Sequence, residues 1–466
     1  MIAALGHRIN LAFRATAPDP FVLAVLLTLV TFILVLAGTD TSFIQAVDAW
    51  AGPSGVWSAG MLRFAMQMCL ILVTGHALAS SPAMSALLER LARLPRSPGG
   101  AVALVAATAG VLGVLNWGLG LIAGALLARR VGIESQRRGI GVHYPLLAAA
   151  GYVGLLVWHG GFSGSAPLKV TLASEIRDIF GDNPPFDALT IPQTILSPLN
   201  LFVTGGLLVI VPALMALMHP SAEHTEAVSM FGVDAPGDES SVREPHKPII
   251  PRLLEDSPLV TVLLVGLIGI WAWRYYLPAA DPKTGVRPPS GITALTPDTV
   301  NMTMLMLGLL LHGTPMKYVR AVEQAARGCA GIILQFPLYA GIMGLMAASG
   351  LASRMADGIA GIATPNTLPV FTFLSAGVVN LFVPSGGGQW AVQGPIAMRA
   401  AVDAGVDPAR MVMALAYGDE LTNMLQPFWA LPLLAITGVK ARDIVGYTAI
   451  VMLLAGVWMT LGLLLL

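Results

Sequence analysis

The chain has 466 residues, of which 55% are hydrophobic and only 11% charged, whereas an ordinary globular domain carries roughly 25% charged residues. A soluble fold cannot bury that much apolar surface, so the composition excludes an ordinary soluble domain. The 26 Lys and Arg residues balance 26 Asp and Glu residues, which gives no support for a nucleic-acid partner. Cys69 and Cys329 lie inside apolar runs, which indicates buried thiols rather than a disulfide framework.

The first apolar run predicts a membrane helix at about 20–37. It is too long for the apolar region of a signal peptide, which spans roughly 7 to 15 residues. Arg8 and Arg14 precede it, so the positive-inside rule predicts a cytoplasmic amino terminus. A second helix, at about 56–80, is expected to return to the cytoplasmic side.

The apolar segment 101–128 is flanked by arginines on both sides. A single crossing would leave one of these basic clusters outside. We therefore predict a re-entrant helical hairpin that enters and leaves on the cytoplasmic side and turns within 116–120. The backbone polar groups of that turn need protein or water partners, because lipid supplies none.

A further helix at about 144–158 is expected to be broken at 159–167, where three glycines and a proline disfavour a regular helix. The next span, at about 192–218, returns to the cytoplasm. It leads to a polar linker at 220–256 that is rich in Pro, Glu, Asp and Ser. A linking helix at about 258–277 then crosses outward.

The second half of the chain repeats landmarks of the first half at an offset of about 265 residues, a sign of internal duplication. The paired landmarks are Gln67 with Gln335, Asn116 with Asn380, and Tyr152 with Tyr417. Because the linking helix reverses the starting side, the repeats should be inverted, as in many secondary transporters. The predicted organisation is a first repeat at 1–219, the linker at 220–256, a linking helix and outer loop at 257–296, and a second repeat at 297–466.

Hairpin tips and helix breaks place free backbone amides and carbonyls at membrane depth, where half-helix ends can hold a carboxylate without Lys or Arg. Their neighbouring hydroxyl and amide groups are the predicted substrate or ion site. Ser and Thr can also simply cap broken helices, and Asn can join spans. The candidates are Asn116, Ser163, Ser165, Asn380, Ser385, Thr422 and Asn423.

Ionisable side chains inside membrane segments are functional candidates by default. Four of them could relay protons or be satisfied structurally by helix ends: His76, His159, Asp419 and Glu420. Aromatic residues beside the breaks could wall a small acyl pocket or serve only in packing: Trp117, Phe162, Trp390, Phe428 and Trp429. The sequence contains no zinc-protease, nucleophile-elbow or phosphate-loop motif, so we expect neither an enzyme nor a metal site.

Four stretches resemble the bacterial short-chain fatty acid transporter family, and the similarity extends over nearly the whole chain. They lie at 73–81, 160–165, 383–388 and 426–432, and include the sequences Gly-Gly-Phe-Ser-Gly-Ser and Val-Pro-Ser-Gly-Gly-Gly. The resemblance implies uptake of short monocarboxylates such as butyrate or acetoacetate through the bacterial inner membrane.

More distantly, the hairpins and broken helices are similar to the ion transporter superfamily, whose members work as dimeric elevators. That similarity implies a homodimer and an elevator-type alternating access. The Ser-Asn-Thr tips typical of its sodium-coupled carriers occur here only loosely, at 384–386 and 421–423, so the coupling ion could be H⁺ or Na⁺. An ion-coupled di- or tricarboxylate carrier, a channel for small anions and an intramembrane enzyme remain as alternatives.

Overall fold

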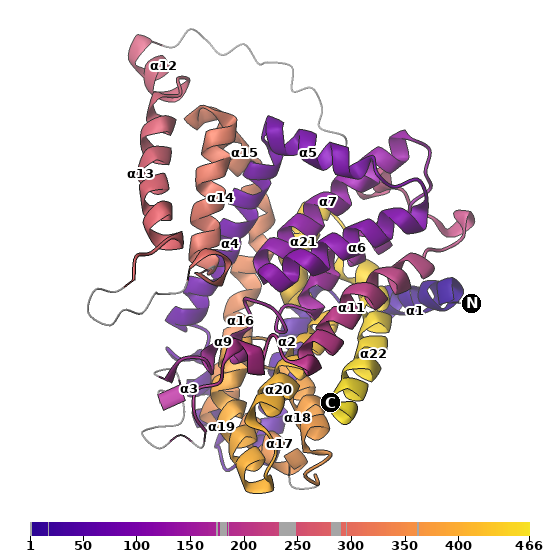
Figure 1. Cartoon of the computed structure of the whole chain (residues 1–466), viewed down its shortest axis with the longest axis vertical. Helices are drawn as coiled ribbons and strands as arrows, with labels where there is room; N and C mark the ends of the chain where they lie inside the picture. The colour runs from indigo at the N-terminus through magenta and orange to yellow at the C-terminus, as the bar shows by residue number, and fades with distance from the viewer. Residues whose placement is uncertain are drawn as a thin grey trace.

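In a computed structural model, the chain folds into α-helices and short 3₁₀ turns, with no strand among the residues that the structure describes (Figure 1). The described residues are 2–16, 18–173, 176–177, 184, 186–232, 248–280, 290–294, 296–360 and 363–466. The predicted all-α, polytopic fold class is therefore confirmed. The predicted linker at 220–256 and the outer loop before residue 297 lie partly outside the described residues.

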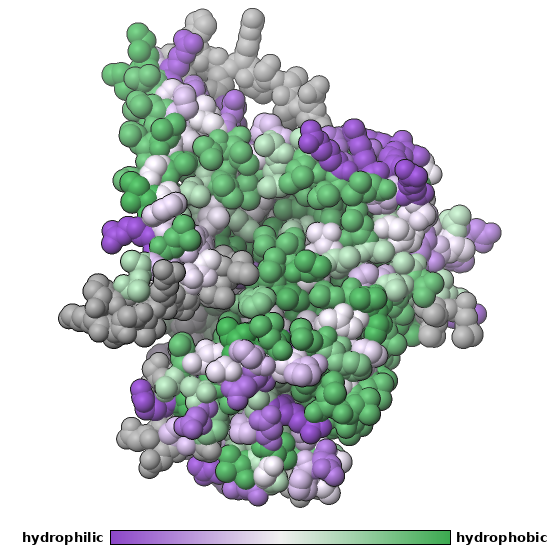
Figure 2. Space-filling view, in the orientation of Figure 1, coloured by the Kyte–Doolittle hydropathy of each residue, from purple (hydrophilic) through white to green (hydrophobic). Residues whose placement is uncertain are grey.

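Seven helical segments in the described part of the chain are long and apolar enough to cross a membrane. They are α2 (Pro20–Gly38), α4 (Ala59–Ser80), α6 (Pro98–Leu115), α11 (Pro198–Leu217), α12 with α13 (Ile249–Tyr276), α16 (Ala330–Ala348) and α22 (Ala441–Leu465). Three apolar helices are shorter: α8 with a 3₁₀ turn (Tyr144–Leu156), α18 (Leu368–Asn380) and α21 (Pro427–Thr437). Figure 2 shows apolar residues over the middle of the visible face and hydrophilic residues at its upper right and lower end.

The described residues also form other α-helices. They are α1 (Ile2–Thr16), α3 (Phe43–Ala51), α5 (Pro82–Ala92), α7 (Trp117–Arg137), α9 (Ser165–Lys169), α14 (Pro297–His312), α15 (Pro315–Ala326), α17 (Leu351–Ala360), α19 (Gly386–Ala404) and α20 (Pro408–Thr422).

The first hairpin pairs α6 with α7 through a single residue, Asn116, which caps both helices. A Cβ atom on Gly120 would lie 2.5 Å from the Cα of Gly113, so the two backbones touch where they leave the turn. Glycine is required here because any side chain would separate the helices. The predicted turn at 116–120 is thus shorter than expected, since α7 already begins at Trp117.

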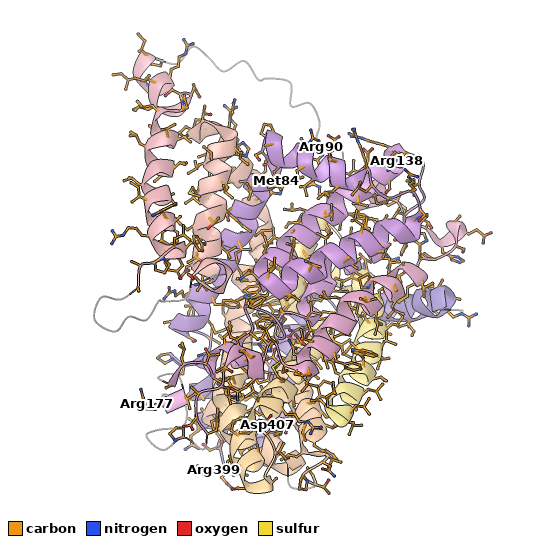
Figure 3. All side chains as sticks on the ribbon, in the orientation of Figure 1. Met84, Arg90, Arg138, Arg177, Arg399 and Asp407 are labelled. Atoms are coloured by element: carbon orange, nitrogen blue, oxygen red, sulfur yellow. The ribbon has the colours of Figure 1, made fainter. Side chains whose placement is uncertain are left out.

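The second hairpin pairs α18 with α19 through residues 381–385. Side-chain amides join its arms: Gln389 Nε2 donates to the carbonyl of Ala376 at 2.8 Å, and Gln393 Nε2 donates to Ser375 Oγ at 3.0 Å. The open end of the first hairpin, near Arg138, lies at the opposite end of the molecule from Asp407, which follows the second hairpin (Figure 3). The inverted relationship of the two halves and their boundaries stay predictions.

Two helices are interrupted as the glycine and proline pattern predicts. The first is irregular between Leu156, where its 3₁₀ turn ends, and Ser165, where α9 begins. Pro167 therefore lies within the short helix α9 and not in the break, which is compatible with its ring because it occupies the first turn. The second passes from α20 through a 3₁₀ turn (Asn423–Leu425) and the extended residue Gln426 into α21.

Candidate functional site

The tip of the first hairpin is capped by two of the predicted site residues. Asn116 Oδ1 accepts from the backbone N–H of Leu119 at 3.1 Å, and Ser163 Oγ accepts from the N–H of Trp117 at 2.9 Å. Ser163 belongs to the first helix break, so this bond joins the break to the hairpin tip. Both side chains satisfy amides that the first turn of α7 leaves free.

Asn380, the last residue of α18, ties the second hairpin to the second break. Its side-chain nitrogen lies 2.7 Å from the carbonyl oxygen of Asp419, 3.0 Å from Thr422 Oγ1 and 2.9 Å from Asn423 Oδ1. Gln426 Nε2 in turn donates to the backbone carbonyl of Asn380. The amides Asn380 and Asn423 have no exposed surface, so this network is held in the protein interior.

The first break also contacts the second half through His159. The backbone N–H of His159 donates to Glu420 Oε2 at 2.9 Å. Its ring Nδ1 lies 3.1 Å from the carbonyl oxygen of Ala416 and 3.6 Å from Asp419 Oδ1. His159, Asp419 and Glu420 are at most 1% exposed, so the two carboxyl groups lie next to the broken backbone and away from bulk solvent.

The second hairpin tip lies directly against the first break. A Cβ atom on Gly386, the first residue of α19, would lie 2.4 Å from His159 Nε2 and 2.9 Å from Trp158 Cη2. Ser385 precedes this glycine and caps α19 by accepting from the N–H of Gly388 at 3.2 Å. The two breaks and the two hairpin tips therefore form one contiguous region.

Several polar atoms in this region are buried without a hydrogen-bond partner among the described residues. Buried polar groups in proteins are almost always paired, so an unpaired group needs an explanation such as an absent ligand, ion or water. The atoms are His159 Nε2, Asp419 Oδ2, Glu420 Oε1, Asn380 Oδ1, Asn423 Nδ2 and Gln426 Oε1.

A cluster of three tryptophans lies beside the capped tip of the first hairpin. The ring centroids of Trp117, Trp158 and Trp429 are separated by 5.4 to 6.4 Å, and Phe64 of α4 packs against Trp117 and Trp429. The indole N–H groups of Trp158 and Trp429 are buried and have no acceptor within the described part of the chain. An apolar wall with unused donors suits a small molecule that has an acyl tail and a carboxylate.

The structure brings most of the predicted residues together and separates two of them. Asn380, Thr422, Asn423, Asp419 and Glu420 share one network, while Asn116, Ser163, Ser385 and His159 lie at the tips and break that adjoin it. Within the part of the chain that the structure describes, no side-chain hydrogen bond joins Ser165 to them. His76 lines a separate cavity. The assignment of these residues to substrate or ion binding stays a prediction.

Sequence reasoning missed Trp158 and Asn200. Asn200 lies in the first turn of α11, and its Nδ2 donates to the carbonyl of Gly160 in the first break at 2.8 Å. An isolated amide at the start of an apolar span was a usable signal for it. Trp158 adjoins the break, but only the fold shows that it meets Trp117 and Trp429. Among the described residues, no group of three or more His, Cys, Asp or Glu side chains could hold a metal ion.

Comparison with known proteins decides the family. The sequence model of the family described as "Short chain fatty acid transporter" matches residues 1–466. The chain belongs to the short-chain fatty acid transporter family. It is accordingly a multi-pass membrane protein of a transporter family, as the resemblance of its glycine-rich segments implied.

The proteins that are similar to this chain include two relatives and one solved structure. Proteins named "Putative short-chain fatty acid transporter" are 41% identical in Escherichia coli (strain K12), over 96% of both chains, and 36% identical in Haemophilus influenzae, over 92% of both. The YdaH transporter of Alcanivorax borkumensis has a TM-score of 0.45 and 19% identity, covering 96% of this chain and 97% of its own.

Proposed function

We propose that this chain is a secondary transporter that carries short-chain monocarboxylates, such as butyrate or acetoacetate, across the bacterial inner membrane. The observation that carries the proposal is the meeting of two helix breaks and two hairpin tips around buried polar atoms without partners. The names of the relatives give the same substrate class.

The residues of this region fit the two ends of such a substrate. The indole N–H groups of Trp158 and Trp429 can donate to a carboxylate, and the amino-terminal ends of α7 and α19 favour an anion beside them. The faces of the tryptophan cluster can bury the acyl tail, with each buried methylene contributing about 0.8 kcal/mol. A short tail is favoured because the cluster is closely packed, with centroids 5.4 Å apart at its nearest pair.

Transport of an anion past Asp419 and Glu420 needs a compensating positive charge. Burial of an unpaired carboxylate is strongly unfavourable, so a bound proton or cation would accompany the substrate. We therefore assign His159, Asp419 and Glu420 to the coupling-ion site, with H⁺ or Na⁺ as the ion. His159 is the group that connects this site to the tip of the second hairpin.

Alternating access is proposed to be of the elevator type, in a homodimer. The two hairpins and two interrupted helices would move as a unit, because hydrogen bonds join them to one another across the halves. The long spans outside the hairpins would then form the scaffold against which this unit slides.

Uptake of labelled butyrate by proteoliposomes tests the proposal. The wild-type protein should show saturable uptake that an imposed proton or sodium gradient accelerates, and excess acetoacetate should compete. Absence of uptake under both gradients would reject the substrate class. Flux that rises without saturation would indicate a channel, and stronger competition by succinate than by acetoacetate would indicate a dicarboxylate carrier.

A further inference from the structure

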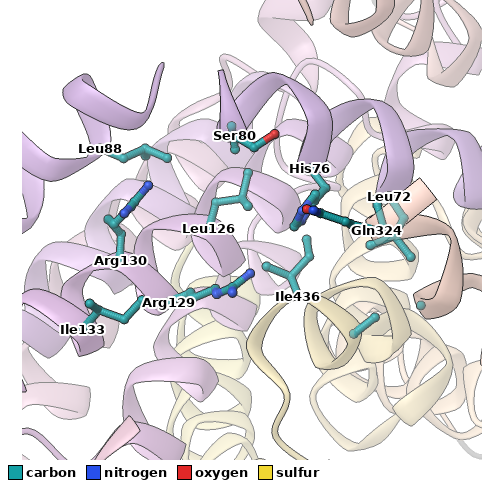
Figure 4. Close-up of a pocket in the computed structure, with 14 residues that line it drawn as sticks. Leu72, His76, Ser80, Leu88, Leu126, Arg129, Arg130, Ile133, Gln324 and Ile436 are labelled. Atoms are coloured by element: carbon teal, nitrogen blue, oxygen red, sulfur yellow. The ribbon is translucent and has the colours of Figure 1, made fainter. Parts of the chain in front are cut away.

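A cavity lies away from the helix breaks, between α4, α5, α7, α15 and α21. Its volume is about 550 Å³, and its walls combine the apolar side chains Leu72, Leu126 and Ile436 with the polar side chains of Arg129, His76 and Gln324. Figure 4 shows the Arg129, His76 and Gln324 side chains around the same hollow. A volume of this size is ample for a molecule of four carbon atoms.

Three helices, α4, α7 and α21, extend from the tryptophan cluster to this cavity. In α4, Phe64 packs against the cluster and Leu72 lines the cavity. In α7, Trp117 belongs to the cluster and Arg129 lines the cavity, and α21 contributes Trp429 to the cluster. In α21 the cavity residue is Ile436. In each helix the cavity residue follows the aromatic one, so all three run in the same direction. Twelve residues of α7 at about 1.5 Å each place Arg129 about 18 Å from Trp117.

Arg129 is a cation without a carboxylate partner in the described part of the chain. The nearby acidic groups are already paired with other arginines. Glu89 lies 3.6 Å from Arg93 and 3.8 Å from Arg137, and Glu134 lies 3.4 Å from Arg93. An unpaired guanidinium beside apolar walls is suited to bind a monocarboxylate through charge-assisted hydrogen bonds.

We propose that this cavity is a second binding site for the transported monocarboxylate, in which Arg129 holds the carboxylate and Leu72, Leu126 and Ile436 hold the acyl tail. The inference rests on the proposed function. It adds a positively charged binding site on the predicted cytoplasmic side of the central site, whose own carboxylate-binding groups are uncharged donors. A short fatty acid that leaves the tryptophan cluster along α7 would pass from the indole N–H groups of the cluster to this arginine.

Protection of an engineered cysteine tests the site directly. Ser80 lines the cavity and is exposed, whereas the native Cys69 and Cys329 are buried, so Ser80→Cys should provide the main reactive thiol. Sodium butyrate should slow the reaction of Ser80→Cys with a maleimide, and butan-1-ol at the same concentration should not. Equal labelling rates with and without butyrate would overturn the proposal.

Charge variants in the Ser80→Cys background identify the group responsible. Arg129→Gln should raise the butyrate concentration for half-protection at least about fivefold, as expected for loss of a charge-assisted hydrogen bond, and Arg129→Lys should restore part of the effect. The matched control is Arg90→Gln on α5, because Arg90 is exposed and has no described partner. Unchanged protection in Arg129→Gln would overturn the assignment.

The outcomes for the cavity and for transport are separable. Protection without butyrate uptake by proteoliposomes would retain the cavity site and reject the proposed function. Saturable uptake without protection would retain the proposed function and reject the cavity site.

Discussion

Tyr152 and Tyr417 each donate a hydrogen bond from one half of the chain to the region of the other half's helix break. Tyr152 Oη lies 2.7 Å from the carbonyl oxygen of Asn423. Tyr417 Oη lies 3.0 Å from Oδ1 of Asn200, the amide that donates to the first break. Because both hydroxyls are in the interior, the two breaks depend on one another for their backbone geometry.

Removal of the Tyr152 hydroxyl should therefore destabilise the second break. Tyr152→Phe keeps the ring but leaves the carbonyls of Asn423 and Gln426 without this donor. We expect the free energy of unfolding to fall by about 1 to 2 kcal/mol, measured by thermal unfolding in detergent. Tyr447→Phe is the control, since the buried Tyr447 hydroxyl has no partner among the described residues, and it should be neutral. Equal losses in both variants would contradict the assigned role.

Asn380 should be important for transport because its one side chain joins three residues of the second break. Asn380→Ala removes the amide that lies within 3.0 Å of Asp419, Thr422 and Asn423, so the second hairpin loses the side-chain bonds of Asn380 to the break. We expect butyrate uptake to fall at least about tenfold, the effect of losing roughly 1.4 kcal/mol. Met68→Ala, in the core of α4, is the comparison for a loss of packing alone. An Asn380→Ala protein that transports better than Met68→Ala would count against the site.

The amino-terminal helix α1 should depend on an ion-pair cluster. Arg14 pairs with Glu226 and lies 3.0 Å from Asp443 at the start of α22, and the hydrogen bond that Arg14 donates to Glu226 raises the pKa of Arg14. Arg14→Ala should lower the free energy of unfolding by about 1 to 3 kcal/mol, because it removes the guanidinium that two partly buried carboxylates contact. Arg8→Ala, at an exposed position of the same helix, should have little effect on thermal unfolding. Similar melting shifts in both variants would exclude a specific cluster.

Length, hydropathy and charge predicted the spans well. The segments expected at about 20–37 and 258–277 correspond to α2 and α13, and the arginines on both sides of 101–128 predicted the first hairpin. The short helices α1, α3, α5, α15 and α17 were not predicted. They are not long apolar runs, so hydropathy does not mark them; α1 and α5 carry the basic residues that indicated only the orientation of the chain.

The residue types of the candidate site could be predicted from the sequence, but the contacts between its residues could not. Glycine and proline marked the breaks because they disfavour regular helix, and this also identified the polar neighbours Ser163, Thr422 and Asn423. The contacts that join His159 to Glu420 and to Gly386 connect residues more than 200 positions apart. Such contacts arise from packing of the two halves, which no local pattern encodes. His76 was grouped with His159 because both are ionisable, yet it lines the separate cavity that contains Arg129.

The close contact of Gly386 with the first break allows a direct test of whether the second hairpin tip and the first break form one transport site. A Cβ on Gly386 would meet His159 and Trp158 at less than 3.0 Å, whereas a Cβ on the neighbouring Gly387 would come no nearer than 3.9 Å, to Lys169. We therefore compare labelled butyrate uptake by Gly386→Ala and Gly387→Ala proteoliposomes, after matching both proteins for thermal unfolding. We expect loss of uptake in Gly386→Ala and near wild-type uptake in Gly387→Ala. A folded Gly386→Ala protein with full, saturable uptake would contradict this expectation.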